Sequence, residues 1–403
     1  QQQQQQQQMF IDRVASHSKE LKKSREAFKA AVLVRCRILQ GLPVVRHARQ
    51  RGPHLRKSDL AVLEATEAAD AAQLFAAELV EHSPPDALVA RRGPESETDE
   101  LMASHARSAG MLGDAHPLLN LIEPNRKSRR GPQLMCEYAH EKKAPQVVWF
   151  ISQLRRIIEA LALQTDMGNI VSDTTGNEKN GQLPSVHILD IGGGRGDLAI
   201  CVATAFRDRC HVTVVDCNSQ SLSQGRERAS ALGLDEGMTW LCCGITDLQP
   251  EQFRHVDVVL GLHACGGLTD AILNLTWKLQ ALRNASRKPP VSFLICPCCF
   301  SKNLDLLPAG SWASERPQSQ VEVLTRLAES DERNVSLRAM LVINSARLVA
   351  ASTALRTLQS GTTSLELRLL AFSEQLSGRN LVLQGMLFAD QQTSDVPSSR
   401  VCA

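Results

Sequence analysis

The sequence predicts an α/β fold: a Rossmann-like, doubly wound, seven-stranded sheet with an antiparallel last strand, preceded by a mainly helical N-terminal region. Three observations predict it. Short β-rich runs alternate with helical stretches in the second half of the chain, a glycine-rich turn joins the first run to its helix, and a hairpin pattern lies near the end. Such alternation implies parallel strands joined by crossover helices.

The predicted elements follow in order. Helical stretches near Asp197–Phe206, Ser219–Leu232 and Leu268–Leu282 separate most of five β-rich runs, which are Val186–Ile191, His211–Asp216, Met238–Cys242, Val256–Leu262 and Val291–Cys296. Helices at about 318–330 and 334–358 precede two more strands, Leu365–Phe372 and Asn380–Leu387. The tight turn Ser377-Gly378-Arg379 between these two favours a hairpin, so the last strand should be antiparallel.

Four regions are predicted along the chain: a disordered poly-Gln segment at 1–8, a basic and mainly helical region at 9–130 with a linker at 83–99, an α/β domain at 140–390, and a disordered tail at 391–403. Helices are expected at Phe10–Leu39 and at Ser58–Val80, with Ser58 as N-cap. Helical spacing resumes from Val147 to Leu161, and the polar, Gly-rich and Asn-rich stretch Thr165–Pro184 predicts a loop.

Charge is unevenly distributed. The formal net charge is only +2, yet Ile11–Leu60 holds thirteen Lys and Arg against four Asp and Glu. A basic segment beside a near-neutral domain favours an anionic partner such as RNA, and a solvated basic helix is the alternative. No uninterrupted apolar run is long enough to span a bilayer, so no membrane partner is expected.

Cysteine usage bears on the compartment. The twelve cysteines include the adjacent pairs Cys242-Cys243 and Cys298-Cys299, which are poor disulfide candidates on strands. Reduced thiols favour a cytoplasmic or nuclear location. The basic amphipathic stretch after Met9 leaves import into an organelle open.

The strongest motif is the glycine-rich turn Asp190-Ile191-Gly192-Gly193-Gly194-Arg195-Gly196-Asp197. Glycines let the backbone turn sharply and approach a ligand, and open α/β sheets bind ligands at such strand ends. Asp197 stands where a dinucleotide-binding loop has its third glycine, and an acid at a helix N-terminus disfavours a pyrophosphate. A cationic sulfonium ligand tolerates this acid far better.

Two further acids follow strands. Asp216 ends the second predicted strand, twenty residues after Gly196, where it could accept hydrogen bonds from both ribose hydroxyls of an adenosine. Ile245-Thr246-Asp247 follows the third strand and could reach the adenine edge. Alone, each acid is more often a helix cap or a surface residue.

Together these residues resemble the class I S-adenosylmethionine (SAM)-dependent methyltransferases, whose sheet has seven strands with an antiparallel last strand. The resemblance covers residues 140–390 and implies SAM as the cofactor. It implies that Asp216 binds the ribose, that Ile245 and Asp247 lie at the adenine, and that the methionyl part is held by Asp190, Gly192, Gly193, Gly194 and Gly196.

The fourth and fifth strands end in Leu262-His263-Ala264-Cys265-Gly266 and Cys296-Pro297-Cys298-Cys299. In this fold these two ends flank the reacting methyl group. The pair is similar to a subgroup with Leu-His-x-Cys-Gly and Pro-Cys-Cys motifs, which includes proteins named for an additional glutathione S-transferase C-terminal-type domain. A more distant similarity is to the acceptor-stem tRNA 2′-O-methyltransferase. Lys142 and Lys143, which begin the preceding helix, also fit this subgroup and are expected to bind substrate.

The catalytic candidates are His263, Cys265, Asp270, Pro297, Cys298 and Cys299. His263 could act as a general base or only hold its loop by hydrogen bonds. Asp270 could stabilise a helix dipole or orient His263, and the dipole role is favoured. No metal is expected, because zinc ligand pairs usually keep two or more residues between them and Cys298-Cys299 does not.

Cys265 and Cys298 also occupy the strand-end positions of the nucleophiles of RNA cytosine-C5 methyltransferases. Covalent catalysis is therefore an alternative, but the acid and proline beside that nucleophile are absent, and packing as small residues is favoured. The predicted function is methyl transfer from SAM to an acceptor, with tRNA or rRNA preferred. The alternatives are a protein or small-molecule methyltransferase, and a catalytically idle assembly factor, which the intact glycine loop disfavours.

Overall fold

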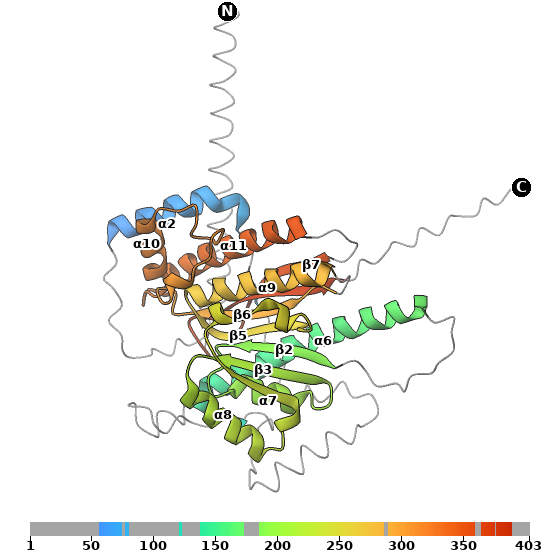
Figure 1. Cartoon of the computed structure of the whole chain (residues 1–403). Helices are drawn as coiled ribbons and strands as arrows, with labels where there is room; N and C mark the ends of the chain where they lie inside the picture. Colours follow the sequence, from blue (N-terminus) through green and yellow to red (C-terminus); the bar gives the residue numbers. More distant parts are fainter. Residues whose placement is uncertain are drawn as a thin grey trace, which may run out of the picture.

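The computed structural model describes residues 56–74, 77–79, 121–122, 138–172, 185–285, 289–358, 364–374 and 376–388. The predicted helix Phe10–Leu39, most of the basic segment, the linker 83–99 and both predicted tails lie outside these residues. The described elements build one mixed sheet with helices on both of its faces (Figure 1).

The predicted seven strands are confirmed, each within a few residues. They are β2 (Val186–Ile191), β3 (Cys210–Asp216), β4 (Met238–Cys242), β5 (Val258–Cys265), β6 (Ser292–Cys298), β7 (Ser364–Ala371) and β8 (Leu381–Phe388). The sheet order is β1-β7-β8-β6-β5-β2-β3-β4, and β8 runs antiparallel to both β6 and β7. The ends of β2 and β5 lie side by side, so the glycine loop and the His263 segment meet at one sheet edge.

An eighth, short strand extends the predicted sheet. β1 (Ala77–Leu79) pairs parallel with β7, although the sequence placed these residues at the end of a helix. The prediction of one helix over Ser58–Val80 is therefore wrong after Asp70. Pairing with the open edge of β7 outweighs the helical propensity of this Ala-rich stretch.

Helices cover both faces of the sheet. On one face lie α6 (Ala144–Ser172), α7 (Asp197–Ala205) and α8 (Ser219–Ala231). α6 contacts β6 and β8, α7 contacts β3, and α8 contacts β4. On the other face α9 (Gly267–Ala285) contacts β5 and β6, and α11 (Arg333–Leu358) contacts α9, β7 and β8. A π-helical turn, η3 (Tyr138–Lys143), leads into α6.

The predicted apolar stripe of α6 is buried along its whole length, from Val147 to Leu161. Its aromatic end packs on the hairpin strands, where the rings of Trp149 and Phe372 lie 5.4 Å apart between centroids. The helix continues to Ser172, so the loop predicted to start at Thr165 starts later. Once a helix is nucleated, each added residue gains a backbone hydrogen bond, which carries α6 past its buried stripe.

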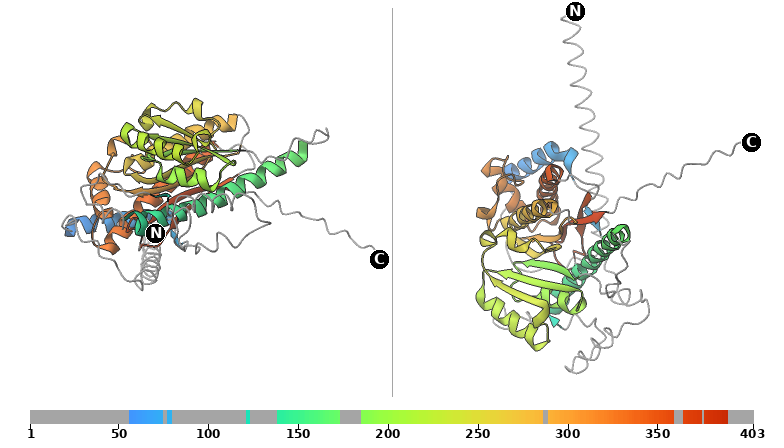
Figure 2. Two further views of the ribbon diagram at one scale, coloured as in Figure 1. Left: turned by 90° about the horizontal axis from the view of Figure 1, so that it is seen from below. Right: turned by 45° about the vertical axis from the view of Figure 1, so that its right-hand side comes forward.

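The helix before the domain belongs to the same folded body. α2 (Lys57–Asp70) packs on α10 (Gln318–Ala328) and α11, as both views in Figure 2 show. Its carboxylates pair with three arginines: Asp59 with Arg326 at 2.8 Å, Glu67 with Arg338 at 2.5 Å and Asp70 with Arg316 at 2.6 Å.

The start of α2 differs from the prediction. Arg56, not Ser58, is the N-cap of α2, because its backbone is extended and its carbonyl accepts a hydrogen bond from Asp59 at 3.0 Å.

By length and hydropathy alone, Arg333–Thr357 could span a bilayer, with a mean hydropathy of 1.3 over its most apolar stretch. That stretch is 67% buried inside the protein, which is typical of a core helix.

Candidate active site

The glycine loop between β2 and α7 depends on left-handed backbone. Gly192, Gly194 and Gly196 have φ angles of +71°, +56° and +68°. A side chain at any of these positions would strain the backbone. At Gly194 nothing but Asp216 Oδ2, at 3.9 Å, would lie near an added Cβ, so this side of the loop is open to a ligand. The loop therefore presents bare backbone at the sheet edge.

Asp216 joins the loop to the end of β3. Its Oδ2 accepts a hydrogen bond from the Gly194 amide at 2.9 Å, and its Oδ1 accepts one from the Asn218 amide at 2.8 Å. A carboxylate has about four acceptor sites, so both oxygens keep capacity for hydroxyl donors. The structure thus brings Asp216 to the loop, as the sequence predicted, and gives it a second task of holding Gly194.

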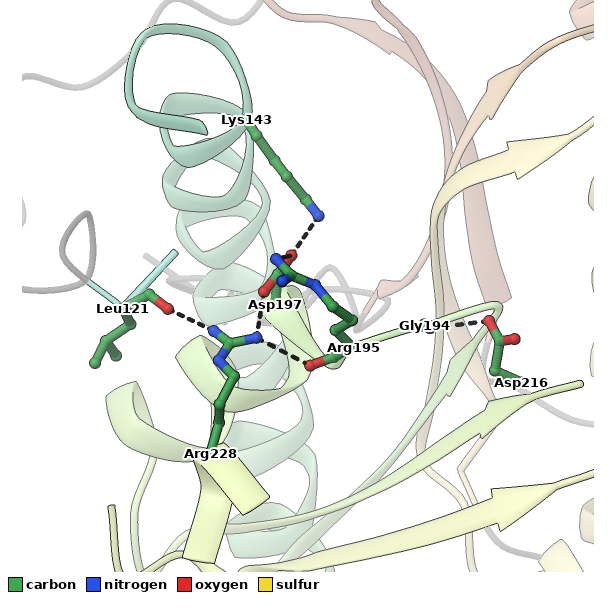
Figure 3. Close-up of polar contacts among 7 residues, drawn as sticks. All are labelled: Leu121, Lys143, Gly194, Arg195, Asp197, Asp216 and Arg228. Atoms are coloured by element: carbon green, nitrogen blue, oxygen red, sulfur yellow. Dashed lines mark hydrogen bonds and ion pairs between the residues drawn. The ribbon is translucent and has the colours of Figure 1, made fainter. Parts of the chain in front are cut away.

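Asp197 lies at the centre of a charge cluster on the other side of the loop (Figure 3). Its carboxylate is 3% exposed and lies 2.5 Å from both Lys143 Nζ and Arg228 Nη1, with Arg195 Nη2 at 3.5 Å. Burial would raise the pKa of Asp197, but Lys143 and Arg228 outweigh it and lower the pKa to about 2. The loop is therefore clamped by a carboxylate that stays ionised.

This cluster gives Lys143 a structural role. Its ammonium group pairs with Asp197 and so connects η3 to the start of α7, and its substrate binding stays a prediction. Its charge also affects the pKa values of Asp190 and His263, so it lies between the two halves of the site. Lys142 is half-buried on the same helical turn, and its substrate role stays a prediction.

Asp190 is an unusual acid beneath the loop. It is 1% exposed, and its Oδ2 has no hydrogen-bond partner among the described residues. Burial and then the charge of Asp216 raise its pKa to about 7. A Cβ on Gly193 would lie 2.6 Å from that oxygen, so Gly193 leaves room for the acid. An unsatisfied buried acceptor of this kind fits a cationic donor group on a ligand.

The adenine side is less enclosed. Ile245–Asp247 forms a short 3₁₀ turn after β4, Ile245 is half-buried, and Asp247 is exposed. Asp247 Oδ2 accepts a hydrogen bond from the Gly244 amide at 3.1 Å. Both residues lie at the same sheet edge as Asp216, and their contact with adenine stays a prediction.

The acceptor half is shaped by a bulge in β5. The β5–β6 register shifts between Leu262 and Ala264, and the extra residue, His263, has a φ of 63°. Bulges re-aim side chains next to active sites. The Nε2 atom of His263 is buried without a hydrogen-bond partner in the described part of the chain, and burial followed by the charge of Lys143 lowers the pKa to about 4. His263 is therefore neutral at pH 7.

The cysteines converge on this bulge. Cys265 Sγ lies 3.1 Å from Cys298 Sγ, and both thiols donate to the carbonyl of His263, at 3.4 Å and 3.1 Å. Pro297, which precedes Cys298 in β6, is buried and pairs with Ala264 of the neighbouring β5. Hydrogen bonds to Cys265 and Cys299, together with burial, raise the pKa of Cys298, which opposes its use as a thiolate nucleophile.

Asp270 is paired with an arginine from another helix. It is 3% exposed and pairs with Arg347 of α11, whose Nη2 and Nε lie 2.7 Å and 3.1 Å from Asp270 Oδ2. Arg347 Nη2 also donates to the Gly266 carbonyl at 3.0 Å. These contacts do not support a role for Asp270 in orienting His263, because the buried guanidinium of Arg347 already satisfies the Asp270 carboxylate.

Several residues that shape the site were not predicted from the sequence. Arg228, Arg347 and Trp240 lie far along the chain from the loops they support, and no local motif marks them. The Trp240 ring fills the space beside Gly196, where an added Cβ would lie 2.5 Å from it. A buried-charge argument could have found Arg347, since an arginine inside an apolar helix needs an acid nearby.

Comparison with known proteins agrees with this geometry. Residues 142–303 match a family model described as a methyltransferase domain, and these residues hold the glycine loop, Asp216 and the His263 bulge. Together with the sheet order and the antiparallel β8, which lies beyond the matched residues, this match identifies a class I SAM-dependent methyltransferase domain.

Two groups of curated relatives are similar to it. The Glutathione S-transferase C-terminal domain-containing protein of Homo sapiens is 28% identical over 141 residues, which are 35% of this chain and 19% of the relative. The Ubiquinone/menaquinone biosynthesis C-methyltransferase UbiE of Bartonella quintana is 34% identical over 121 residues, 30% of this chain and 42% of the relative. This chain thus spans less than half the length of either relative.

Solved structures give weaker matches. TrmN from Thermus thermophilus is 25% identical over 32% of this chain and 37% of its own, with a TM-score of 0.24. The antibiotic-resistance methyltransferase Kmr covers 51% of this chain and 88% of its own at 15% identity, with a TM-score of 0.31.

Proposed function

We propose that this chain transfers a methyl group from SAM to an acceptor, and that the acceptor is RNA. The observation that carries the cofactor part is the unsatisfied, buried Asp190 carboxyl beneath a loop of three left-handed glycines. The observation that favours RNA is the excess of Lys and Arg in Ile11–Leu60. Polycationic segments bind phosphate backbones by releasing counterions.

The residues present fit SAM. Asp190 offers an acceptor to the ammonium group, the open side of Gly194 gives backbone access, and Asp216 keeps acceptor capacity for ribose hydroxyls. When bound, SAM supplies an electrophilic methyl group on a sulfonium.

The acceptor half supplies an unpartnered imidazole nitrogen. His263 is neutral at pH 7 and its buried Nε2 has no partner among the residues that the structure describes. It can therefore accept a hydrogen bond from an acceptor hydroxyl or amine. The left-handed backbone at the bulge fixes the ring at the end of β5, next to the loop that ends β2.

The deciding experiment uses the full chain with methyl-labelled SAM. Fractionated RNA, soluble protein and a small-molecule extract are offered separately, and label is counted in each. We expect incorporation into RNA of the tRNA or rRNA size class. Incorporation into protein or small molecules only would overturn the RNA part and leave methyl transfer standing. SAM binding without transfer to any fraction would favour an assembly factor.

A pH test addresses Asp190 directly. Its pKa of about 7 means that the free protein is partly protonated there at neutral pH, and a bound ammonium favours the ionised form. SAM affinity should therefore rise as pH increases from 6 to 8, with release of a fraction of a proton. Calorimetry in two buffers of different ionisation enthalpy measures that release. Asp190→Asn should bind more weakly and lose the release, and an unchanged release in Asp190→Asn would contradict the assignment.

A further inference from the structure

Three thiols converge where β5 and β6 end. Among the described residues, Cys265, Cys298 and Cys299 form a group whose sulfur atoms all lie within 4.8 Å of one another. Cys265 and Cys298 are paired positions on neighbouring strands, and Cys299 directly follows β6. The group lies at the edge of the sheet that carries the His263 bulge, and neither the family match nor the proposed function assigns it a task.

The spacing of the three sulfur atoms fits a thiolate-bound metal ion. Tetrahedral Zn²⁺ holds thiolate sulfur at about 2.3 Å, which places neighbouring sulfurs about 3.8 Å apart. The separations here extend from 3.1 Å, between Cys265 and Cys298, to no more than 4.8 Å. Small side-chain rotations would therefore bring all three atoms to one ion.

Two positive charges, those of Arg379 and Lys302, act on Cys299. They balance the net negative charge of a zinc ion with three thiolates. Cys298 is 8% exposed, whereas Cys265 and Cys299 are half-buried, so an ion has a route in.

The segment that carries the ligands is held rigidly. Gly266 and Gly267 lie so close to the backbone of Lys302 and Asn303 that a Cβ on either would overlap a carbonyl, and the Gly267 amide donates to the Lys302 carbonyl at 3.0 Å. Asn303 Nδ2 donates to the Cys265 carbonyl at 3.1 Å. Preorganised ligands of this kind lower the cost of ordering a metal site.

We propose that Cys265, Cys298 and Cys299 bind one thiophilic divalent cation, Zn²⁺, as a three-thiolate site with an open fourth position. In the sequence, the adjacency of Cys298 and Cys299 argues against a zinc site, because zinc ligand pairs usually keep two or more residues between them. Their side chains converge nonetheless, because Cys298 ends β6 and the chain turns at Cys299. Binding releases the thiol protons to solvent and ties the ends of β5 and β6 together. This inference does not depend on methyl transfer.

The test measures metal directly. Full-length protein, reduced and kept under anaerobic conditions, is titrated with Zn²⁺ against a chromophoric chelator, and bound zinc is counted by elemental mass spectrometry. We expect about one equivalent per chain, and Co²⁺ substitution should give the absorption of a tetrahedral cobalt thiolate. Cys265→Ser and Cys299→Ser should each weaken zinc binding at least tenfold. Cys298 is left unchanged because it is buried in the sheet, and Cys299→Ser, at a half-buried position after the strand, is the safer variant for folding.

The control is Cys217→Ser together with Cys242→Ser, two exposed thiols outside the group. Zinc binding in this double variant should equal that of the unaltered chain, and an equal loss there would overturn the proposal. It would also be overturned if the reduced protein bound no zinc. A mapped Cys265–Cys298 disulfide in protein that binds no zinc when reduced would identify a redox pair in place of a metal site.

Discussion

The two halves of the site are built by different forces. On the cofactor half, ions define the structure: Asp197 is held by Lys143, Arg228 and Arg195, and Asp216 holds Gly194. On the acceptor half, the groups at the β5 and β6 ends are a neutral imidazole and thiols, held by backbone carbonyls and close packing.

This difference predicts how much a substitution in each half of the site costs. A charge cluster fixes the cofactor loop strongly, because removing one ion leaves others buried without compensation. Thiols and a neutral ring carry little charge, so removing one of them leaves no buried ion without compensation. We therefore expect the loss of a buried ion from the cofactor half to have the largest effect.

The largest effect is expected for Asp197→Ala. It leaves Lys143 and Arg228 without their buried partner, and breaking such a pair costs about 3–5 kcal/mol of unfolding free energy. Denaturant unfolding measures the loss. Glu366→Ala, which removes a half-exposed ion pair with Arg368, is the control and should cost less than about 1 kcal/mol. Equal losses in the two variants would break the comparison.

The next effect is the acid sensitivity that His263 contributes. Its pKa is about 4 in the folded protein, against 6.5 for an ordinary histidine, so the unfolded chain binds more protons between those values. Stability should therefore fall as pH decreases from 6.5 to 4, by up to about 3 kcal/mol from this residue. Thermal and denaturant unfolding across this pH window measure the slope.

His263→Asn isolates the contribution, because Asn tolerates a left-handed backbone and does not titrate. The slope should become shallower but not vanish, since burial also lowers the pKa of His187. A slope identical to that of the unaltered protein would show that His263 is not buried in its neutral form.

A somewhat smaller effect is expected at Asp216. Asp216→Ala removes the acceptor for the Gly194 amide and for ribose hydroxyls, and a hydrogen bond to a charged group contributes about 1.5–3 kcal/mol. SAM affinity measured by calorimetry should fall by about 10-fold to 150-fold. Asp247→Ala, at an exposed carboxylate, should cost less, and the reverse order would mean that the adenosine lies elsewhere.

The smallest effect is expected at the thiols. Cys298→Ser and Cys265→Ser should keep turnover within about tenfold, or about 1.4 kcal/mol of barrier. The raised pKa of Cys298 argues against a nucleophilic thiolate. A 5-fluorocytosine RNA trapped covalently by the unaltered protein, and not by one of these variants, would establish covalent catalysis and reverse the ranking.

How far the sequence predicted the molecule depends on where the interacting residues lie. The strands, the hairpin and the glycine loop were predicted, because each depends on residues within a few positions of one another. The ion pairs were not: Asp197 meets Lys143 across 54 residues, and Asp270 meets Arg347 across 77. An arginine has the same local signature on a surface and in a buried pair, so only the folded chain distinguishes the two.

The same reason explains the error at the N-terminus. β1 forms because β7 offers it an open edge, a partner almost 300 positions away, and its own sequence favours a helix.

The packing of α2 and β1 has a practical consequence for anyone who expresses this protein. A truncation that begins at residue 142, where the family match begins, would delete both elements. Arg316, Arg326 and Arg338 would lose their carboxylate partners, and β7 would become an open sheet edge. Unpaired edges promote self-association of the sheet. Soluble material is therefore best sought from chains that begin no later than Arg56.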